Sequence, residues 1–276
     1  MPMIAARNAY KLFIVGFIVL FALVSLPSHA QDPALMKWLA ASHRTPGNVA
    51  RDAARHPVET LTFFGVRPDS TIVEILPGSG GYYMELLAPY LKEKGRYLAA
   101  NNRGVGAAPQ YAADHERLLA RLKADSPLYG RVEVTQFHRD LYDVAPPGSA
   151  DFVLTFRNLH NWLERDETDG ALRAFHKALK PGGILGVVDH RGRTDASQKE
   201  QMKEGYVRQD FAVALIEKAG FRLTGSSEVN ANLKDTKDHP EGVWSLPPSY
   251  RLGDKDRAKY QAIGESDRFT LRFVKQ

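Results

Sequence analysis

The chain has 276 residues, of which 43% are hydrophobic and 25% are charged, and these shares are ordinary for a globular protein. This composition excludes a wholly disordered chain, a collagen-like fibre and a polytopic membrane protein. The sequence contains no cysteine, which excludes disulfides, thiolate metal sites and a cysteine nucleophile. The net charge of +5 is small and dispersed, so charge gives no support to nucleic-acid binding.

The first thirty residues are typical of a cleaved secretory signal peptide. Arg7 and Lys11 precede an uncharged apolar run over 12–26, and a cleavage site is expected after Ala30. The apolar run has about 15 residues, fewer than the roughly 20 that cross a bilayer. We therefore expect residues 1–30 to be removed and the mature protein to be periplasmic or secreted, without stable membrane insertion. An uncleaved N-terminal anchor is the alternative.

The rest of the chain is predicted to hold an N-terminal helical segment over 31–65 and an α/β domain over 66–276. In the helical segment, Pro33 and Pro57 suit the first turns of helices, and a turn is expected at Thr45-Pro46-Gly47. The predicted strands are 71–76, 96–101, 131–137, 151–156, 184–189, 221–229 and 269–274, the last of them at a sheet edge. The predicted helices of the domain are 82–92, 109–124, 166–179 and 206–219.

Apolar strands that alternate with helices favour an α/β fold, with a Rossmann-like, doubly wound, mostly parallel sheet of seven strands covered by helices on both faces. Ligands of such sheets bind beyond the carboxyl ends of the strands. A turn is predicted at 180–183, ahead of the fifth strand. Residues 231–265 predict a polar loop that is long enough to suggest a function. Its Trp244 is expected to anchor the loop or to close over the cleft.

A glycine-rich turn follows the first predicted strand. The turn is Pro77-Gly78-Ser79-Gly80-Gly81. Glycines let the backbone approach a ligand closely and aim N–H groups of the following helix at it. Glu74, in the preceding strand, is expected to orient the turn or to accept a hydrogen bond from a ligand amine. The alternative is a tight strand–helix turn with Glu74 in water.

Two further strand ends carry polar side chains. Asn101 follows the second strand, where nucleoside-binding sheets usually place an acidic residue that binds the ribose hydroxyls. An amide can also hydrogen-bond a hydroxyl, but without the charge of the acidic residue. Arg157, Asn158 and His160 follow the fourth strand in a predicted loop and are expected to point into one cleft. The alternatives are a turn at Asn101, and a helix cap beside a packed Trp162.

These strand ends, in this order and with the Leu-Lys-Pro-Gly-Gly run at 179–183, resemble the class I S-adenosylmethionine-dependent methyltransferases. Glu74, Gly78 and Gly80 match the family's glycine motif, while Leu76 stands in place of its first glycine. The resemblance covers 66–228 and implies S-adenosylmethionine as the cofactor. The cofactor-binding residues that it implies are Glu74, Pro77, Gly78, Ser79, Gly80, Asn101, Asp140, Leu141 and Asn158, with Asp140 and Leu141 at the adenine edge.

A narrower resemblance extends over nearly all of the mature chain. Residues 51–57, 76–83 and 267–269 are similar to a group of exported bacterial proteins that are predicted methyltransferases on the basis of their fold. This resemblance agrees with the predicted signal peptide.

The resemblance implies methyl transfer to an unknown small-molecule or envelope acceptor. An oxygen or nitrogen nucleophile attacks in line, and the protein positions the reactants and supplies a base. His160 is the first candidate for this base and His190 the second, because imidazole titrates near neutral pH. Asn101 and Leu76 depart from the family pattern, and an exported enzyme needs the cofactor delivered. A non-catalytic exported binding protein on the same fold is therefore the main alternative.

Two other kinds of site have less support from the sequence. Ser79 lies on a strand–helix turn, as the nucleophile of a serine hydrolase does, but Pro77 replaces a glycine of that motif. The turn also follows the first strand of the sheet rather than a later one. No metal site is predicted, because the sequence lacks a His-Glu-x-x-His pattern and adjacent ligand pairs are common by chance.

Overall fold

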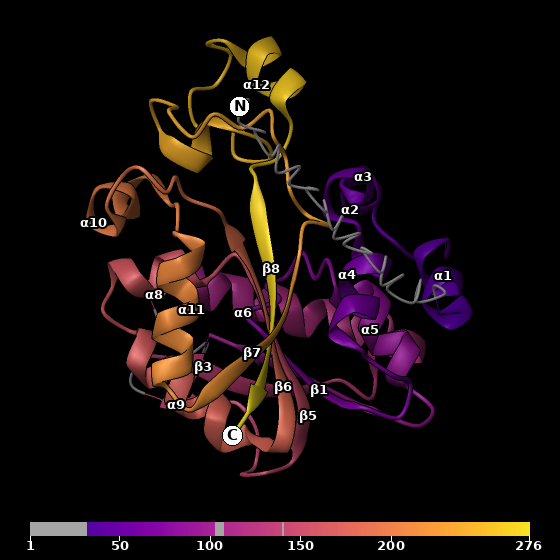
Figure 1. Ribbon diagram of the computed structural model, residues 1–276. Helices are drawn as coiled ribbons and strands as arrows, with labels where there is room; N and C mark the ends of the chain where they lie inside the picture. The colour runs from indigo at the N-terminus through magenta and orange to yellow at the C-terminus, as the bar shows by residue number, and fades with distance from the viewer. Residues whose placement is uncertain (1–31, 103–107, 140) are drawn as a thin grey trace, which may run out of the picture. The chain divides into compact units, whose positions relative to one another are not determined.

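The computed structural model describes residues 32–102, 108–139 and 141–276, so the predicted signal peptide and Asp140 lie outside the described residues. The described part folds around one sheet of eight strands, shown in Figure 1. The strands are β1 (Thr71–Ile75), β2 (Arg96–Asn101), β3 (Glu133–His138), β4 (Leu141–Asp143), β5 (Ala150–Phe156), β6 (Leu179–His190), β7 (Phe221–Ser227) and β8 (Arg268–Lys275). Their order across the sheet is β4-β3-β2-β1-β5-β6-β8-β7.

The sheet confirms the predicted mostly parallel α/β fold and corrects two of its details. β3, β2, β1, β5 and β6 pair in parallel, and β4, β8 and β7 pair antiparallel. The eighth strand is β4, whose three residues are too few to show a pattern in the sequence. The segment 269–274 is not at the edge, because β8 lies between β6 and β7. Phe269, Thr270 and Leu271 are all fully buried, as an interior strand requires.

The structure confirms the predicted helices and adds four short ones, at 126–129, 159–164, 198–201 and 257–263. The α-helices are α1 (Pro33–Leu39), α2 (Pro46–Val49), α3 (Asp52–Arg55), α4 (Pro57–Phe64), α5 (Met84–Leu91), α6 (Pro109–Ala124), α7 (Ser126–Tyr129), α8 (Leu159–Glu164), α9 (Thr168–Ala178), α10 (Gln198–Gln201), α11 (Gln209–Lys218) and α12 (Arg257–Ile263). Two 3₁₀ turns, η1 (Met202–Glu204) and η2 (Gly242–Ser245), complete the described elements. The expected loop after the fourth predicted strand is instead the start of α8. No helix in the described ranges is long and apolar enough to cross a membrane.

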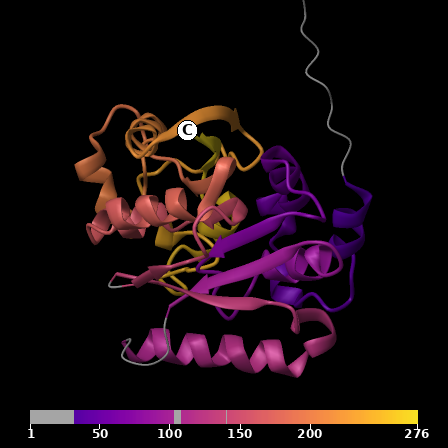
Figure 2. The same cartoon turned by 90° about the horizontal axis from the view of Figure 1, so that it is seen from below.

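Each face of the sheet has its own hydrophobic core, because side chains alternate along a strand. Val73 and Ile75 of β1 pack with residues of α8, α9 and α11. Ile72 packs on the other face with residues of α1, α4, α5 and α6. Figure 2 shows α6 on one side of the sheet and the helices that follow β5 on the other. The two-sided cover confirms the doubly wound architecture.

The residues predicted as a turn ahead of the fifth strand belong to β6. β6 pairs with β5 through Leu179 and again from Ile184 onward, with a register shift between Ala150 and Phe152. Gly182 has φ +73°, a left-handed conformation that glycine adopts without strain. The segment is therefore an irregular strand rather than a turn.

The connection between β7 and β8, residues 228–267, is called here the β7–β8 insertion. It is mostly irregular, as predicted, and contains only η2 and α12 among its regular elements. Figure 1 shows the insertion beside the start of β8, in orange and yellow. Because β8 runs antiparallel to β6, the insertion lies at the carboxyl end of β6, where ligands of such sheets bind.

Candidate functional site

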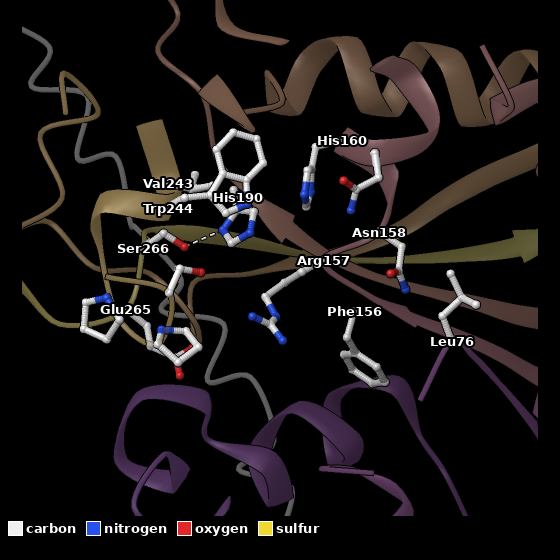
Figure 3. Close-up of a pocket in the computed structure, with 14 residues that line it drawn as sticks. Leu76, Phe156, Arg157, Asn158, His160, His190, Val243, Trp244, Glu265 and Ser266 are labelled. Carbon is white, nitrogen blue, oxygen red and sulfur yellow. Dashed lines mark hydrogen bonds between the residues drawn. The ribbon is translucent and has the colours of Figure 1, made fainter. Parts of the chain in front are cut away.

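A cavity of about 230 Å³ lies at the carboxyl ends of β5 and β6, against the β7–β8 insertion (Figure 3). Its lining includes Leu76 after β1, Phe156, Arg157, Asn158 and His160 at β5 and α8, His190 of β6, and Trp244, Glu265 and Ser266 of the insertion. The structure thus brings Arg157, Asn158 and His160 to one cleft, as predicted. His190, the second candidate base, lines the same cavity.

Asp189 holds the two histidines in place. His160 Nδ1 lies 2.8 Å from Asp189 Oδ1, and the backbone N–H groups of His160 and His190 donate to Oδ2 and Oδ1 at 3.3 and 2.7 Å. Asp189 is fully buried. Because an ionised carboxylate only accepts hydrogen bonds, this contact keeps a proton on Nδ1 of His160. Nε2 of His160 is then the nitrogen that can accept a proton from a ligand.

His190 differs from His160 in its partner. Its Nδ1 and Ser266 Oγ share a hydrogen bond of 2.5 Å. Burial lowers the pKa of His190 well below its ordinary value, and the nearby His160 and Arg157 lower it further. The centres of the two imidazole rings are 5.0 Å apart. His190 is therefore neutral at pH 7 and lies beside the candidate base.

His160, Asp189 and His190 each offer a ligand atom within 4.8 Å of the others, so this group has the residue types of a metal site. No metal site was predicted from the sequence, in which His160 and Asp189 are 29 residues apart. Both oxygens of Asp189 already accept N–H groups. That pattern fits a carboxylate that orients an imidazole.

Leu76, which follows β1, has a left-handed backbone conformation that favours glycine. Its φ is +53°, which is uncommon for a residue with a branched side chain. Gly78, two residues later, has φ +63°. The side chain of Leu76 lines the cavity, where glycine would leave space.

The glycine-rich turn is bound to α6. The N–H group of Ser79 donates to the Asp114 carboxylate at 3.2 Å, and its hydroxyl donates to Oδ1 at 2.6 Å. Arg121 donates to the carbonyl oxygens of Gly80 and Ser79 at 2.8 and 3.1 Å. Within the described ranges Ser79 has no histidine partner, so it lacks the base that a serine nucleophile needs.

Two predicted cofactor residues lie inside the fold at the ends of β1 and β2. Glu74 is 4% exposed and accepts a hydrogen bond of 2.6 Å from the Tyr97 hydroxyl, so the alternative with Glu74 in water is wrong. Burial raises the pKa of Glu74 to about 7, although Tyr97 and Arg55 lower it. Asn101 is 1% exposed, and among the described residues its Nδ2 has no hydrogen-bond partner.

The remaining predicted residues are less closely grouped. Asn158 Nδ2 donates to the carbonyl oxygen of Ile75 and to Thr155 Oγ1, both at 3.1 Å, and so ties the end of β5 to β1. Leu141 begins β4 and is 43% exposed. The predicted adenine contact at Asp140 lies outside the described residues. Glu265 and Ser266 were not predicted as site residues.

Several solved structures with the same fold are methyltransferases. A methyltransferase dependent on S-adenosylmethionine from Aquifex aeolicus superposes with a TM-score of 0.56 at 17% identity, over 89% of this chain and 99% of that one. An arsenic(III) S-adenosylmethionine methyltransferase from Chlamydomonas reinhardtii gives 0.51 at 17%, over 89% and 74%. The [4+2]-cyclase SpnF gives 0.51 at 17%, over 81% and 80%.

No family model and no curated protein matches this sequence. At the identities of these structural neighbours, the likeness establishes the fold and leaves the reaction to be inferred from the site. The cyclase among them shows that this fold also carries other chemistry.

Proposed function

We propose that this protein is an S-adenosylmethionine-dependent methyltransferase that acts on an oxygen or nitrogen of a small acceptor. The observation that carries the proposal is the buried Asp189, which fixes the tautomer of His160 at the cavity. The position of this pair at the carboxyl ends of β5 and β6 agrees with where ligands of this fold bind. His160 is the proposed base and Asp189 the residue that orients it.

The residues present fit the cofactor at two points. Asn101 offers a buried, unpartnered Nδ2 that can donate to a ribose hydroxyl. A Cβ atom on Gly80 would meet no atom within 4 Å, so the turn leaves room beside its backbone. Asn158 would lie nearest the reacting group, and Asp140 with Leu141 would contact the adenine edge. When bound, S-adenosylmethionine would supply a methyl group activated by a sulfonium centre.

The chain's own residues then perform three tasks. His160 Nε2 takes the proton of the acceptor, and Asp189 stabilises the resulting imidazolium. The neutral His190 adds no second positive charge beside it. Trp244, whose ring centre lies 6.1 Å from that of His160, covers the cavity from the insertion and excludes water.

A non-catalytic binding protein is the second candidate, and two observations favour it. The side chain of Leu76 occupies space that glycine would leave open, and Asp114 already binds the N–H group of Ser79. Both features reduce the room and the donors available to a cofactor at the turn.

Calorimetric titration of the purified protein with S-adenosylmethionine separates the two candidates. We expect micromolar binding that Gly80→Asp abolishes, since the new carboxylate fills space meant for the cofactor. Gly47→Asp is the matched control, because a Cβ there also meets no atom within 4 Å. Absence of binding at millimolar cofactor would favour the binding protein. Transfer of labelled methyl groups to a small-molecule extract, lost in His160→Gln, would test the base.

We also propose that the protein is exported and that residues 1–30 are removed. The support is the charge and hydropathy pattern of the sequence. N-terminal sequencing of the protein from the periplasmic fraction should begin at Gln31. A chain that retains Met1 would instead support the uncleaved anchor.

A further inference from the structure

Three buried or partly buried arginines share one carboxylate at the wall of the cavity. Glu265 is 7% exposed and belongs to the β7–β8 insertion. It accepts from Arg51 Nε at 2.7 Å, Arg55 Nε at 3.1 Å and Arg268 Nη1 at 2.8 Å. One negative charge therefore faces three positive charges at close range, so the cluster carries a local excess of positive charge.

The cluster also has unused hydrogen-bond donors. Among the described residues, Arg51 Nη2, Arg55 Nη2 and Arg268 Nε are buried without a hydrogen-bond partner. Arg55 and Arg268 are each only 3% exposed, so water does not readily compensate them. Burial lowers the pKa of Arg268, and its neighbour Arg55 lowers it further. Glu265 of this cluster lines the cavity, so the excess positive charge behind it favours an anion there.

Arg157 adds a further positive charge, and this one lines the cavity itself. Within the described residues, its guanidinium makes no hydrogen bond and no ion pair, and Figure 3 shows it between Glu265 and Phe156. Its φ of +61° is uncommon for a residue other than glycine. Burial lowers the pKa of Arg157 to about 9, and the charge of Arg55 adds to this effect. The guanidinium group of Arg157 therefore has no anionic hydrogen-bond partner among the described residues.

We propose that the cavity binds a small molecule with an oxyanion, a carboxylate or a phosphate monoester, and that Arg157 holds this group. A guanidinium binds such anions through two parallel hydrogen bonds, and arginine suits this task better than lysine. His160, three residues further along the chain, lines the same cavity. An anion held by Arg157 would therefore share the cavity with the candidate base. The identification of this ligand as the methyl acceptor rests on the proposed function, whereas the anion site does not.

The size of the cavity limits the ligand. Its volume of about 230 Å³ is below the range of about 300–1,000 Å³ for drug-sized ligands, so the ligand is small. Trp244 lines it and provides a flat apolar surface beside the charged group. A compact ring or short chain that carries one anionic group suits both features.

The test is a titration of the purified protein, without cofactor, with benzoate, phenyl phosphate and neutral benzamide. We expect at least one of the two anions to bind at least tenfold more tightly than benzamide. Arg157→Gln should weaken that binding at least tenfold, and Arg157→Lys should recover part of it. Arg96→Gln is the control, since Arg96 pairs with Glu133 at the opposite ends of the strands. Binding of neither anion, equal binding of benzamide, or unchanged binding by Arg157→Gln would overturn the proposal.

A second titration separates the acceptor from the carboxylate of the cofactor. Saturating S-adenosylhomocysteine should leave the affinity for the anion within about threefold. Displacement of the anion by S-adenosylhomocysteine would show that the arginines hold the carboxylate of the cofactor, and it would overturn the acceptor site. Failure of S-adenosylhomocysteine to bind at all would refute the proposed methyltransferase. The effect of Arg157→Gln on anion binding in the first titration would then be the only test of the anion site. Circular dichroism of each variant confirms that it is folded.

Discussion

Replacing Glu265 by glutamine removes the carboxylate that Arg51, Arg55 and Arg268 share. The variant keeps the shape of the side chain but leaves three cations beside one another. Removing one partner of a buried ion cluster is strongly destabilising, because the remaining charges stay buried without compensation. We therefore expect Glu265→Gln to lower the free energy of unfolding.

The magnitude follows from the titration of Glu265. Burial alone would raise its pKa, but Arg55, Arg268 and Arg51 lower it from 4.5 to about 2. At about 1.4 kcal/mol per pH unit, this difference corresponds to about 3 kcal/mol at pH 7. Because the pKa is lower in the folded state, the stabilisation is present above pH 4.5 and is lost as the pH falls through 2. At pH 3 about 1 kcal/mol should remain.

Urea unfolding at pH 7 and pH 3, followed by circular dichroism, measures both quantities. The free-energy difference between the natural protein and Glu265→Gln should shrink from about 3 to about 1 kcal/mol. Glu133→Gln is the matched control, since Glu133 is 45% exposed and an exposed pair with Arg96 contributes less than about 1 kcal/mol. A difference below about 1 kcal/mol at pH 7, or one that does not change with pH, would refute this reasoning.

Three further predictions concern single side chains. Burial raises the pKa of Glu74 to about 7, above its unfolded value of 4.5, so its contribution to stability is lost as the pH rises through 7. The free energy of unfolding of Glu74→Gln, relative to that of the natural protein, should therefore rise by about 3 kcal/mol between pH 4 and pH 8 in urea unfolding. A difference between the two proteins that does not change with pH would contradict this. Asp189→Asn should move the proton of His160 from Nδ1 to Nε2 in nitrogen-15 spectra and slow any methyl transfer by about 10²–10⁴-fold. An unchanged tautomer would exclude Asp189 as the orienting residue. Leu76→Gly should lower the free energy of unfolding by less than about 2 kcal/mol in urea unfolding, because glycine adopts the positive φ without strain. A loss of about 2–5 kcal/mol, as for a truncated core side chain, would show that packing outweighs this strain.

The fold was largely predictable because its signals are local. The strand at β1 is an apolar, β-branched run, and α6 begins at Pro109 and ends at Ala124 as predicted. β4 was missed because three residues carry no periodicity. The interior position of β8 depends on its pairing with β6 and β7, which no pattern within 269–274 records.

The site was predictable only where a rule of topology applies. Asn158, His160 and His190 follow strand ends, and the ends of parallel strands meet at one edge. The hydrogen bond between His160 and Asp189 joins α8 to β6, and Glu265 meets Arg55 across 210 residues. Such contacts are set by the folded chain, and neighbouring residues in the sequence do not indicate them.

The pKa values of two buried glutamates are shifted in opposite directions because different numbers of cations surround them. Glu74 has one hydroxyl donor and the distant charge of Arg55, and burial raises its pKa to about 7. Glu265 is surrounded by arginines, and they hold its pKa at about 2. Glu265 nevertheless neutralises only one of the three cations that bind it.

This excess of charge is hard to explain by stability alone. Well-packed apolar side chains of similar volume often stabilise a fold as well as a buried ion cluster does, or better. The donors of Arg51, Arg55 and Arg268 that have no hydrogen-bond partner among the described residues add a desolvation cost. An anion at Arg157 would offset part of the excess positive charge beside Glu265, where the cluster meets the cavity. The excess of arginines around Glu265 is therefore better explained by an anionic ligand in the cavity than by the packing of the fold.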